Sequence, residues 1–175
     1  MSHHQHRAEA PATLRFGVIT ASDTRGEAED QSGQYLKAQV AAAGHALASY
    51  AVVRDDPDAI RAALRAAAAA GAEAIVINGG TGIASRDRTY EAVAGLLEKR
   101  LDGFGELFRM LSFAEIGSAA MLSRAVAGSW DGRAVFSVPG SRAAVRLAWE
   151  RLIAPEAGHL LRELRKDAAP APVKR

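Results

Sequence analysis

The segment AIVINGGTG, residues 74–82, is the strongest indication of the fold in this sequence. The first four residues are apolar, three of them β-branched, and Asn78 follows them; such a short apolar run is typical of a central parallel strand covered on both faces. Three glycines and a threonine follow at once, so the strand is predicted to end in a tight turn. Glycines at the carboxyl end of such a strand let the backbone approach a ligand closely.

The segments on either side of this strand repeat a strand-loop-helix pattern. Further strands are predicted at residues 14–20, 46–53 and 134–138, and helices at 32–43, 57–71 and from 141 to about 165. Asp56 before Pro57 is predicted to cap one helix, and Gly44 to end another. Strands that alternate with helices predict a three-layer α/β/α sandwich with a mostly parallel sheet.

The region between residues 83 and 133 is predicted to be largely helical. Thr89 is interpreted as the cap of a helix that carries Val93, Leu96 and Leu97. A second helical block contains Phe104, Leu107, Phe108 and Leu111, and it leads into a segment unusually rich in small polar residues for a helix. That segment, which includes Ser112, Glu115 and Ser118, is interpreted as a ligand wall, a subunit contact or a set of helix caps.

Length and composition indicate one folded domain. The chain has 175 residues, of which 49% are apolar and 24% charged, and we place the domain at residues 14–165. Residues 1–13 are expected to be a disordered segment and residues 166–175 a tail. The histidines at positions 3, 4 and 6 could bind a metal, but we interpret them as part of a disordered end or an expression remnant.

Several classes of protein are excluded by what the sequence lacks. It contains no cysteine, which removes disulfides, thiolate nucleophiles and cysteine-based zinc sites. No apolar run approaches the ~18 residues that span a bilayer, so a soluble cytoplasmic protein without membrane contact is expected. The net charge is +2, and the excess lies in residues 165–175, which carry four basic residues and one acidic residue. Nucleic-acid binding is therefore not expected, because such proteins concentrate basic residues on the folded domain.

The glycine-rich turn and the residues after it form the best candidate site. Backbone N–H groups of Gly79, Gly80, Thr81 and Gly82 could face an anion, with Arg86 as a further donor; a plain tight turn is the alternative. The P-loop spacing and the dinucleotide fingerprint are both absent.

Asp87 adds a carboxylate beside this anion-binding turn, and that placement is unfavourable unless a cation intervenes. Mg²⁺ held by carboxylates and substrate phosphates would reconcile the two. Capping, or pairing with Arg86 or Arg88, is the alternative role for Asp87.

Further polar residues follow the other strands and are expected at the same edge of the sheet. Asp55 and Asp56 follow the second strand, although Asp56 is also well placed to cap a helix. The remaining candidates are Ser22 and Asp23 after the first strand and Gly140 and Ser141 after the last.

Taken together, these segments resemble the MoaB/MogA family of molybdenum cofactor biosynthesis proteins, over roughly residues 16–155. The resemblance is greatest to the MoaB branch in residues 103–124. It is carried by Thr20–Arg25, Asp30–Gly33, Gly44-His45, Gly79–Gly82 with Arg86-Asp87, Gly103–Arg109, Ser112–Gly117, Leu122–Ala125, Pro139–Ser141 and Ala148–Glu150.

The resemblance implies a function. Family members are trimers, or hexamers built from trimers, that bind molybdopterin. The terminal phosphate of molybdopterin attacks the α-phosphate of ATP in the presence of Mg²⁺, which gives adenylyl-molybdopterin and pyrophosphate. Other enzymes of the molybdenum cofactor pathway are implied as possible partners. A non-catalytic molybdopterin carrier is one alternative, and an unrelated flavodoxin-like nucleotide-binding module is another.

The resemblance also implies roles for particular residues. Asp87 matches the family aspartate that follows the glycine turn, and it is implied to position Mg²⁺ and phosphate. Asp55 or Asp56 is implied to be the second catalytic carboxylate. The implied substrate- and nucleotide-binding residues are Ser22, Asp23, Gly79, Gly80, Thr81, Gly82, Arg86, Ser112, Glu115, Ser118, Gly140 and Ser141.

Overall fold

The computed structural model describes residues 13–166. The expected disordered N-terminal segment, apart from Thr13, lies outside the described residues, as do its histidines. The expected C-terminal tail also lies outside them, apart from Lys166.

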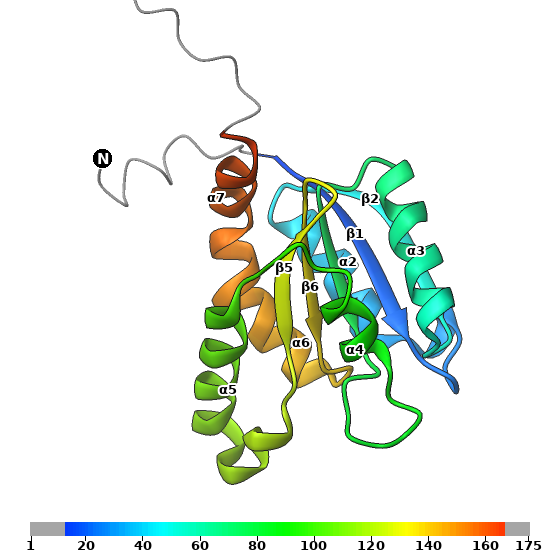
Figure 1. Ribbon diagram of the computed structural model, residues 1–175, viewed down its shortest axis with the longest axis vertical. Coiled ribbons are helices and arrows are strands. Elements are labelled where there is room, and N and C mark those ends of the chain that lie inside the picture. Colours follow the sequence, from blue (N-terminus) through cyan, green and yellow to red (C-terminus); the bar gives the residue numbers. More distant parts are fainter. Residues whose placement is uncertain (1–12, 167–175) are drawn as a thin grey trace, which may run out of the picture.

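One sheet runs through the described residues, and its six strands follow the order β2-β1-β3-β6-β5-β4 (Figure 1). The strands are β1 (Arg15–Ala21), β2 (Ala46–Val53), β3 (Ala74–Asn78), β4 (Lys99–Arg100), β5 (Val126–Trp130) and β6 (Arg133–Val138). β2, β1, β3 and β6 are parallel to one another, whereas β5 pairs antiparallel with β6, and β4 pairs antiparallel with β5 at the edge of the sheet. The predicted mostly parallel sheet is confirmed.

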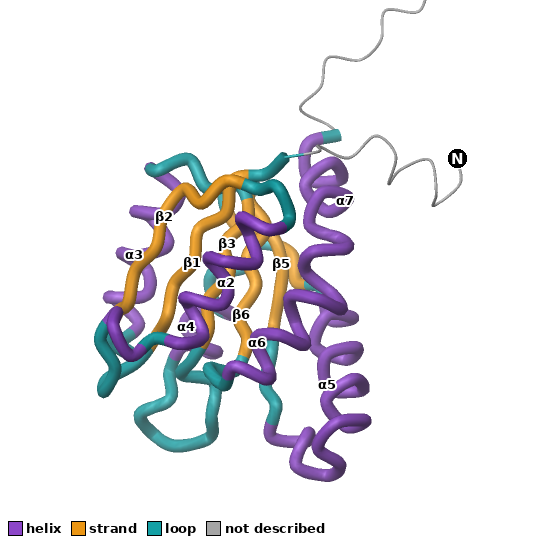
Figure 2. The backbone as a smooth tube through the Cα atoms, turned by 180° about the vertical axis from the view of Figure 1, so that it is seen from behind, coloured by secondary structure: helices purple, strands orange, loops and turns teal. Residues whose placement is uncertain are grey.

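Helices cover both faces of this sheet. They are α2 (Gln31–Ala42), α3 (Pro57–Ala69), α4 (Thr89–Ala94), α5 (Asp102–Ile116), α6 (Arg142–Ala148) and α7 (Ala154–Arg165), with short helical segments η1 (Glu27–Glu29), η2 (Gly117–Leu122) and η3 (Trp149–Ile153). α3 and α4 lie on one face (Figure 1), and α2 and α6 on the other (Figure 2). Within residues 13–166, no helix is both long enough and apolar enough to cross a bilayer.

β3 contributes to the core on both sides of the sheet, as its composition predicts. Ala74 and Val76 pack in the cluster beneath α2, α5, α6 and α7, whereas Ile75 and Ile77 pack in the cluster beneath α3 and α4. All five residues of the strand are buried. Burial of four apolar side chains and of Asn78 makes β3 a rigid base for the glycine turn that follows it.

The structure corrects part of the helical prediction after residue 83. Thr89 does not cap α4, because Arg88 occupies the N-cap position and the Thr89 hydroxyl donates to Asp55. α4 ends at Ala94, so Leu96 and Leu97 lie beyond it and pack against the core from a loop. β4 and β5 were not predicted.

Two predicted caps are confirmed. The Asp56 carboxylate accepts hydrogen bonds from the N–H groups of Asp58 and Ala59 at the start of α3. Gly44 follows α2 with a φ of 76°, a conformation that glycine adopts without steric cost.

Candidate functional site

A hollow of about 350 Å³ lies at the carboxyl ends of the parallel strands, at the lower end of the sheet in Figure 1. The loops after β1, β3 and β6 form it, together with the end of η2. Its lining is Thr20, Ala21, Arg25, Asn78, Gly79, Gly80, Thr81, Gly82, Asp87, Leu122, Ser123, Pro139, Gly140 and Ser141. The chain runs outward from β1 to β2 and returns to β3, so the hollow lies where the strand order reverses, the usual ligand position in such sheets.

The glycine turn requires its glycines. Gly79 and Gly80 have φ values of 98° and 60°, and a Cβ on Gly79 would overlap the carbonyl oxygen of Ala21. Among the described residues, the N–H groups of Gly80, Thr81, Gly82 and Ile83 donate no hydrogen bond. Successive unpaired N–H groups beside a hollow are suited to an anion such as a phosphate.

Asp55 holds the end of this loop, and it lies against the glycine turn. Its Oδ1 accepts hydrogen bonds from the Arg88 N–H, at 3.1 Å, and from the Thr89 hydroxyl, at 2.8 Å. A Cβ on Gly80 would overlap the other carboxylate oxygen. Asp56 is directed instead to the first turn of α3. The structure therefore brings Asp55, and not Asp56, to the glycine turn.

Asp87 lines the hollow from the far side of the loop. Its Oδ2 accepts a hydrogen bond from the Ala84 N–H, at 3.0 Å, and a Cβ on Gly82 would overlap the same oxygen. No ion pair of Asp87 with Arg86 or Arg88 occurs within residues 13–166. The carboxylate is thus placed against the free N–H groups of the turn without a cationic side chain to neutralise it.

The carboxylates of Asp87 and Asp55 fit a divalent cation that takes most of its ligands from water and substrate phosphates. Among the described residues, no group of three His, Cys, Asp or Glu side chains could hold a metal. Mg²⁺ is commonly bound by one or two carboxylates with the other positions filled by water and substrate phosphates. Asp87, with Asp55 behind the turn, matches that pattern.

A buried hydrogen-bond network lies under the hollow. The carboxylate of Asp30 is fully buried, and it accepts from the hydroxyls of Thr20, at 2.6 Å, and Tyr50, at 2.8 Å. Burial raises the pKa of the Tyr50 hydroxyl above its ordinary value, and the hydrogen bond to Asp30 raises it further. Asn78 donates to the Thr20 hydroxyl, at 2.8 Å, and its buried Oδ1 has no partner among the described residues. The ends of β1 and β3 are thereby fixed relative to each other.

The start of α2 connects the loop after β6, which forms the third wall of the hollow, to this network. The Ser32 hydroxyl donates to the carbonyl oxygen of Gly140, at 2.9 Å. Ser141 caps α6 by accepting from the Ala144 N–H, at 3.2 Å. A Cβ on Gly140 would lie 2.9 Å from the Cα of Gly79, so the loops after β3 and β6 are in contact and glycine is needed where they meet.

Not every residue predicted for the site lines the hollow. The Ser22 hydroxyl accepts from the N–H groups of Thr24 and Arg25, and so shapes its own turn. Asp23 accepts from the Asp55 N–H, at 3.1 Å, and so holds the end of β2. Arg86 is exposed and is absent from the lining. These residues lie beside the hollow in the loops that form it.

The three candidates on the polar segment after Leu111 lie outside the lining of the hollow within this chain. Ser112 is buried on α5, Glu115 pairs with Arg146 on α6 at 2.9 Å, and Ser118 is exposed on η2. η2 instead reaches the hollow through Leu122 and Ser123. Sequence reasoning missed Thr20 and Asn78 in the lining, and it singled out Arg25 and Ser123 only as members of polar segments, without assigning them to the site.

Comparisons with known proteins give matches over most of this chain. A profile of the family described as "Probable molybdopterin binding domain" matches residues 17–159. The "Molybdenum cofactor biosynthesis protein B" of Halalkalibacterium halodurans is 53% identical over 169 residues, which is 95% of this chain and 99% of that protein.

Two solved structures are also similar. A crystal structure of a molybdenum cofactor biosynthesis protein B has a TM-score of 0.86 at 49% identity, and covers 90% of this chain and 99% of that one. The tungsten cofactor synthesizing protein MoaB from Pyrococcus furiosus has a TM-score of 0.82 at 41% identity, with 89% and 99% covered.

Proposed function

This chain belongs to the MoaB/MogA family of molybdenum cofactor biosynthesis proteins, and from that premise we propose that it is a molybdopterin adenylyltransferase. It would bind molybdopterin and ATP at the hollow beside β3 and release adenylyl-molybdopterin and pyrophosphate. Membership in the family makes it a molybdopterin-binding domain of molybdenum cofactor biosynthesis. The adenylyl transfer is our proposal.

The observation that carries the proposal is the row of unpaired N–H groups at Gly80, Thr81 and Gly82, three residues that line the hollow together with Asp87. Both proposed substrates carry anionic phosphate groups, and backbone N–H groups stabilise such groups without a large positive charge on the protein. The small net charge of the chain, +2, agrees with local recognition of this kind.

In the proposed reaction, an oxygen of the molybdopterin terminal phosphate attacks the α-phosphorus of ATP. A new phosphorus–oxygen bond forms, the bond from the α-phosphorus to the bridging oxygen breaks, and pyrophosphate leaves with the bonding electrons. The chain would hold the two phosphates in line, which supplies most of the catalysis in transfers of this kind. The N–H groups of the turn would stabilise the charge that develops on the phosphate oxygens.

Asp87 is proposed to hold Mg²⁺ in this site, with Asp55 as the second functional carboxylate. When bound, the cation would neutralise phosphate charge. The chain's own contribution is to keep the Asp87 carboxylate next to the turn, through its bond from the Ala84 N–H, and to keep the end of the loop fixed through Asp55.

An adenylylation assay tests this function. Purified protein is incubated with molybdopterin, ATP and Mg²⁺, and adenylyl-molybdopterin and pyrophosphate are quantified by chromatography. Equimolar formation of the two products is expected, at a rate proportional to protein concentration. Absence of both products would show that the enzyme proposal is wrong.

The alternative of a non-catalytic carrier is separated from the enzyme by calorimetry. An adenylyltransferase is expected to bind ATP in a Mg²⁺-dependent manner, whereas a pure carrier binds molybdopterin and shows no such ATP binding. The family match leaves no support for an unrelated flavodoxin-like module.

We also propose that the protein self-associates, as trimers or as hexamers built from trimers. Support comes from large apolar side chains that are exposed together on α5 and η2, namely Leu107, Met110, Phe113, Ile116, Met121 and Leu122. An exposed apolar surface of this kind usually marks an interaction site. Sedimentation equilibrium is expected to give a trimer or hexamer that Phe113→Glu dissociates. A monomeric wild-type protein would contradict the proposal, and other pathway enzymes would then be candidates for this surface.

A further inference from the structure

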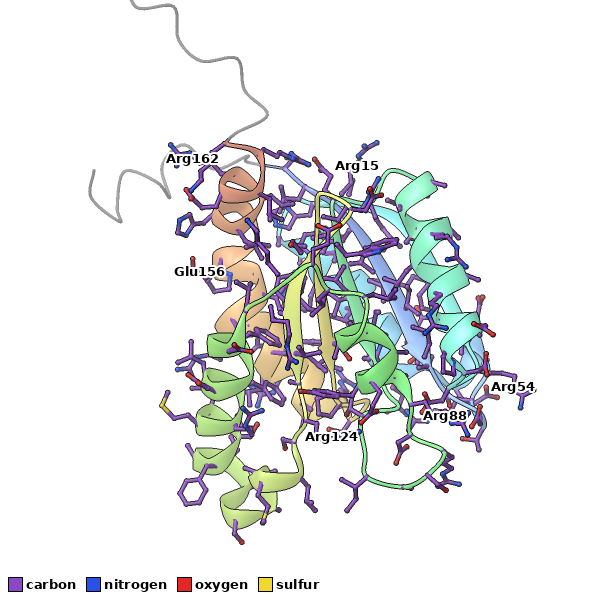
Figure 3. The ribbon with its side chains drawn as sticks, in the orientation of Figure 1. Arg15, Arg54, Arg88, Arg124, Glu156 and Arg162 are labelled. Carbon is purple, nitrogen blue, oxygen red and sulfur yellow. The ribbon has the colours of Figure 1, made fainter. Side chains whose placement is uncertain are left out.

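We propose that Arg124 is a positioning residue that orients the anion-binding N–H groups of the glycine turn. The proposal rests on the proposed function only in taking the ligand of the hollow to be a phosphate. Arg124 lies after η2 and before β5, more than 40 residues along the chain from the turn, and Figure 3 shows it at the same end of the sheet as Arg88.

The first step of the argument is how Arg124 contacts the turn. Its Nε donates to the carbonyl oxygen of Thr81, at 2.8 Å, and its Nη2 donates to the carbonyl oxygen of Gly82, at 2.7 Å. The side chain is 27% exposed. The planar fork of a guanidinium is suited to two neighbouring acceptors. Two successive carbonyl groups of the turn are therefore held by one rigid group.

The guanidinium is itself held in place from other directions. It forms an ion pair with Glu91 on α4, and it lies 4.6 Å from the ring centre of Tyr90. The hydrogen bond from Arg124 holds the pKa of Glu91 below its ordinary value. The contact with the turn is thus anchored to α4.

Holding these carbonyl groups also fixes two N–H groups. A trans peptide is planar, and its C=O and N–H bonds point in opposite directions. The Thr81 carbonyl shares a peptide plane with the Gly82 N–H, and the Gly82 carbonyl shares one with the Ile83 N–H. Because both carbonyls face Arg124, both N–H groups face away from it, and neither has a partner among the described residues.

The turn needs such a clamp because its glycines leave it flexible. Glycine loses more conformational freedom on ordering than any other residue, and a ligand that had to order the turn would bind more weakly for that reason. By ordering the turn beforehand, Arg124 would leave the N–H groups ready for the anion. Its contribution to binding is indirect, since Nε and Nη2 donate to the carbonyls and Nη1 donates to Glu91.

Arg133 provides a matched control at the opposite end of the sheet. Its Nε also donates to a backbone carbonyl, that of Ala72, at 3.1 Å. It also pairs with a carboxylate, Asp131, and its side chain is 24% exposed. Arg124→Gln and Arg133→Gln therefore remove similar contacts, and they are expected to lower stability to a similar extent.

The test is titration of the full-length protein with pyrophosphate, followed by calorimetry. Arg124→Gln is expected to weaken binding by at least about tenfold, because small misplacements of binding groups have effects of that size, whereas Arg133→Gln leaves binding unchanged. In ¹⁵N spectra, the amide signals of Gly82 and Ile83 are expected to shift on titration of wild type, and in Arg124→Gln only at pyrophosphate concentrations at least about tenfold higher. Equal affinities of wild type and Arg124→Gln would overturn the proposal.

Arg124→Lys separates positioning from charge. Lysine keeps the positive charge and lacks the fork, so it is expected to bind pyrophosphate almost as weakly as the glutamine variant. Full restoration by lysine would overturn the positioning role. If Arg124→Gln does not fold, Glu91→Gln and Arg124→Lys together test the proposal. Glu91→Gln keeps Arg124 and removes the carboxylate that anchors it, and it is expected to weaken pyrophosphate binding less than Arg124→Lys does. Unchanged affinity in both variants would overturn the proposal.

The same measurements distinguish this proposal from the proposed function. Wild type that binds pyrophosphate but forms no adenylyl-molybdopterin contradicts the enzyme and leaves the role of Arg124 intact. Adenylylation that survives in Arg124→Gln with unchanged pyrophosphate affinity contradicts the role of Arg124 alone. Failure of wild type to bind pyrophosphate contradicts the anion site itself, and with it this proposal.

Discussion

The two ends of the parallel sheet use the same contacts to different effect. At the amino end, Arg133 donates to a backbone carbonyl and Glu73 accepts from the N–H of Arg15, at 2.9 Å. At the carboxyl end, Arg124 donates to backbone carbonyls and Asp55 accepts from a backbone N–H. Figure 3 shows Arg15 at the first end and Arg124 at the second.

The difference lies in what these contacts leave open. At the amino end, the guanidinium of Arg15 packs against Gly71, so that a Cβ on Gly71 would lie 2.7 Å from Nη1 of Arg15. Glu73 is further paired with Arg165, at 2.8 Å. At the carboxyl end, the contacts surround a hollow and leave N–H groups of the glycine turn without partners among the described residues. Ion pairs and hydrogen bonds of the same kind thus cover the amino end of the sheet, whereas at the carboxyl end they leave backbone N–H donors available to a ligand.

Exchange of one carboxylate at each end gives the largest expected contrast. Asp87→Asn is expected to lower the adenylylation rate by at least ~100-fold with ligand binding largely intact, because charge stabilisation acts mainly in the transition state. Asp131→Asn, in the turn before β6, is the control. Its φ is 47°, a conformation that asparagine tolerates. Rates are measured under single-turnover conditions, and an unchanged rate for Asp87→Asn would remove Asp87 from the mechanism.

A smaller contrast is expected from alanine in place of one glycine at each end. Gly79 and Gly71 have φ values of 98° and 85°, so both substitutions carry a similar backbone cost. The new Cβ at position 79 meets the backbone carbonyl of Ala21, whereas at position 71 it meets a flexible arginine. Gly79→Ala is expected to lower the free energy of unfolding by about 2 kcal/mol more than Gly71→Ala, as measured with urea. Equal losses would mean that the carboxyl end is no more constrained than the amino end.

The smallest effect is expected from the pH dependence of the amino end. Burial raises the pKa of Glu73, but hydrogen bonds from Arg165 and the Arg15 N–H outweigh it, so the net pKa lies below the ordinary 4.5. A lowered carboxylate pKa adds stability above pH 4.5 that is lost as the pH falls through the folded-state value.

Glu73→Gln is therefore expected to reduce stability at pH 7 by about 1 kcal/mol, and the difference from wild type should shrink in acid. Urea unfolding at pH 7 and pH 3.5 measures this. Pyrophosphate binding should be unchanged, since Glu73 lies far from the hollow in the sheet. A difference in stability that persists in acid would contradict the role of the Glu73 charge.

The sequence was most informative where local pattern determines structure. The bounds of β2 and β3 agree with their predictions, because each is a short, mostly apolar segment bounded by turn residues. β5 was missed because Gly128 and Ser129 interrupt its apolar pattern. A Cβ on Gly128 would overlap the carbonyl oxygen of Lys99, so glycine is required there by the pairing with β4, which a single segment does not reveal.

The position of the candidate site could be predicted from the sequence, but the long-range contacts within it could not. That the loops after β1, β3 and β6 meet at one edge follows from parallel strands alone, and the structure brings them together. Thr89 was misassigned because Asp55, 34 residues away, takes its hydroxyl, and Arg124 reaches the turn across 43 residues. Contacts over such distances in the chain leave no periodic signal in the sequence.

The register of the sheet also determines when the hollow can form during synthesis. β3 pairs with β6 from Ala74↔Ala134 to Asn78↔Val138, so the loop that supplies the third wall leaves the ribosome long after the glycine turn. A nascent chain that ends before Pro139 has the turn and Asp87 but no closed hollow. The hollow can therefore close only after the loop that follows β6 has been synthesised, when nearly the whole domain is able to fold as one unit.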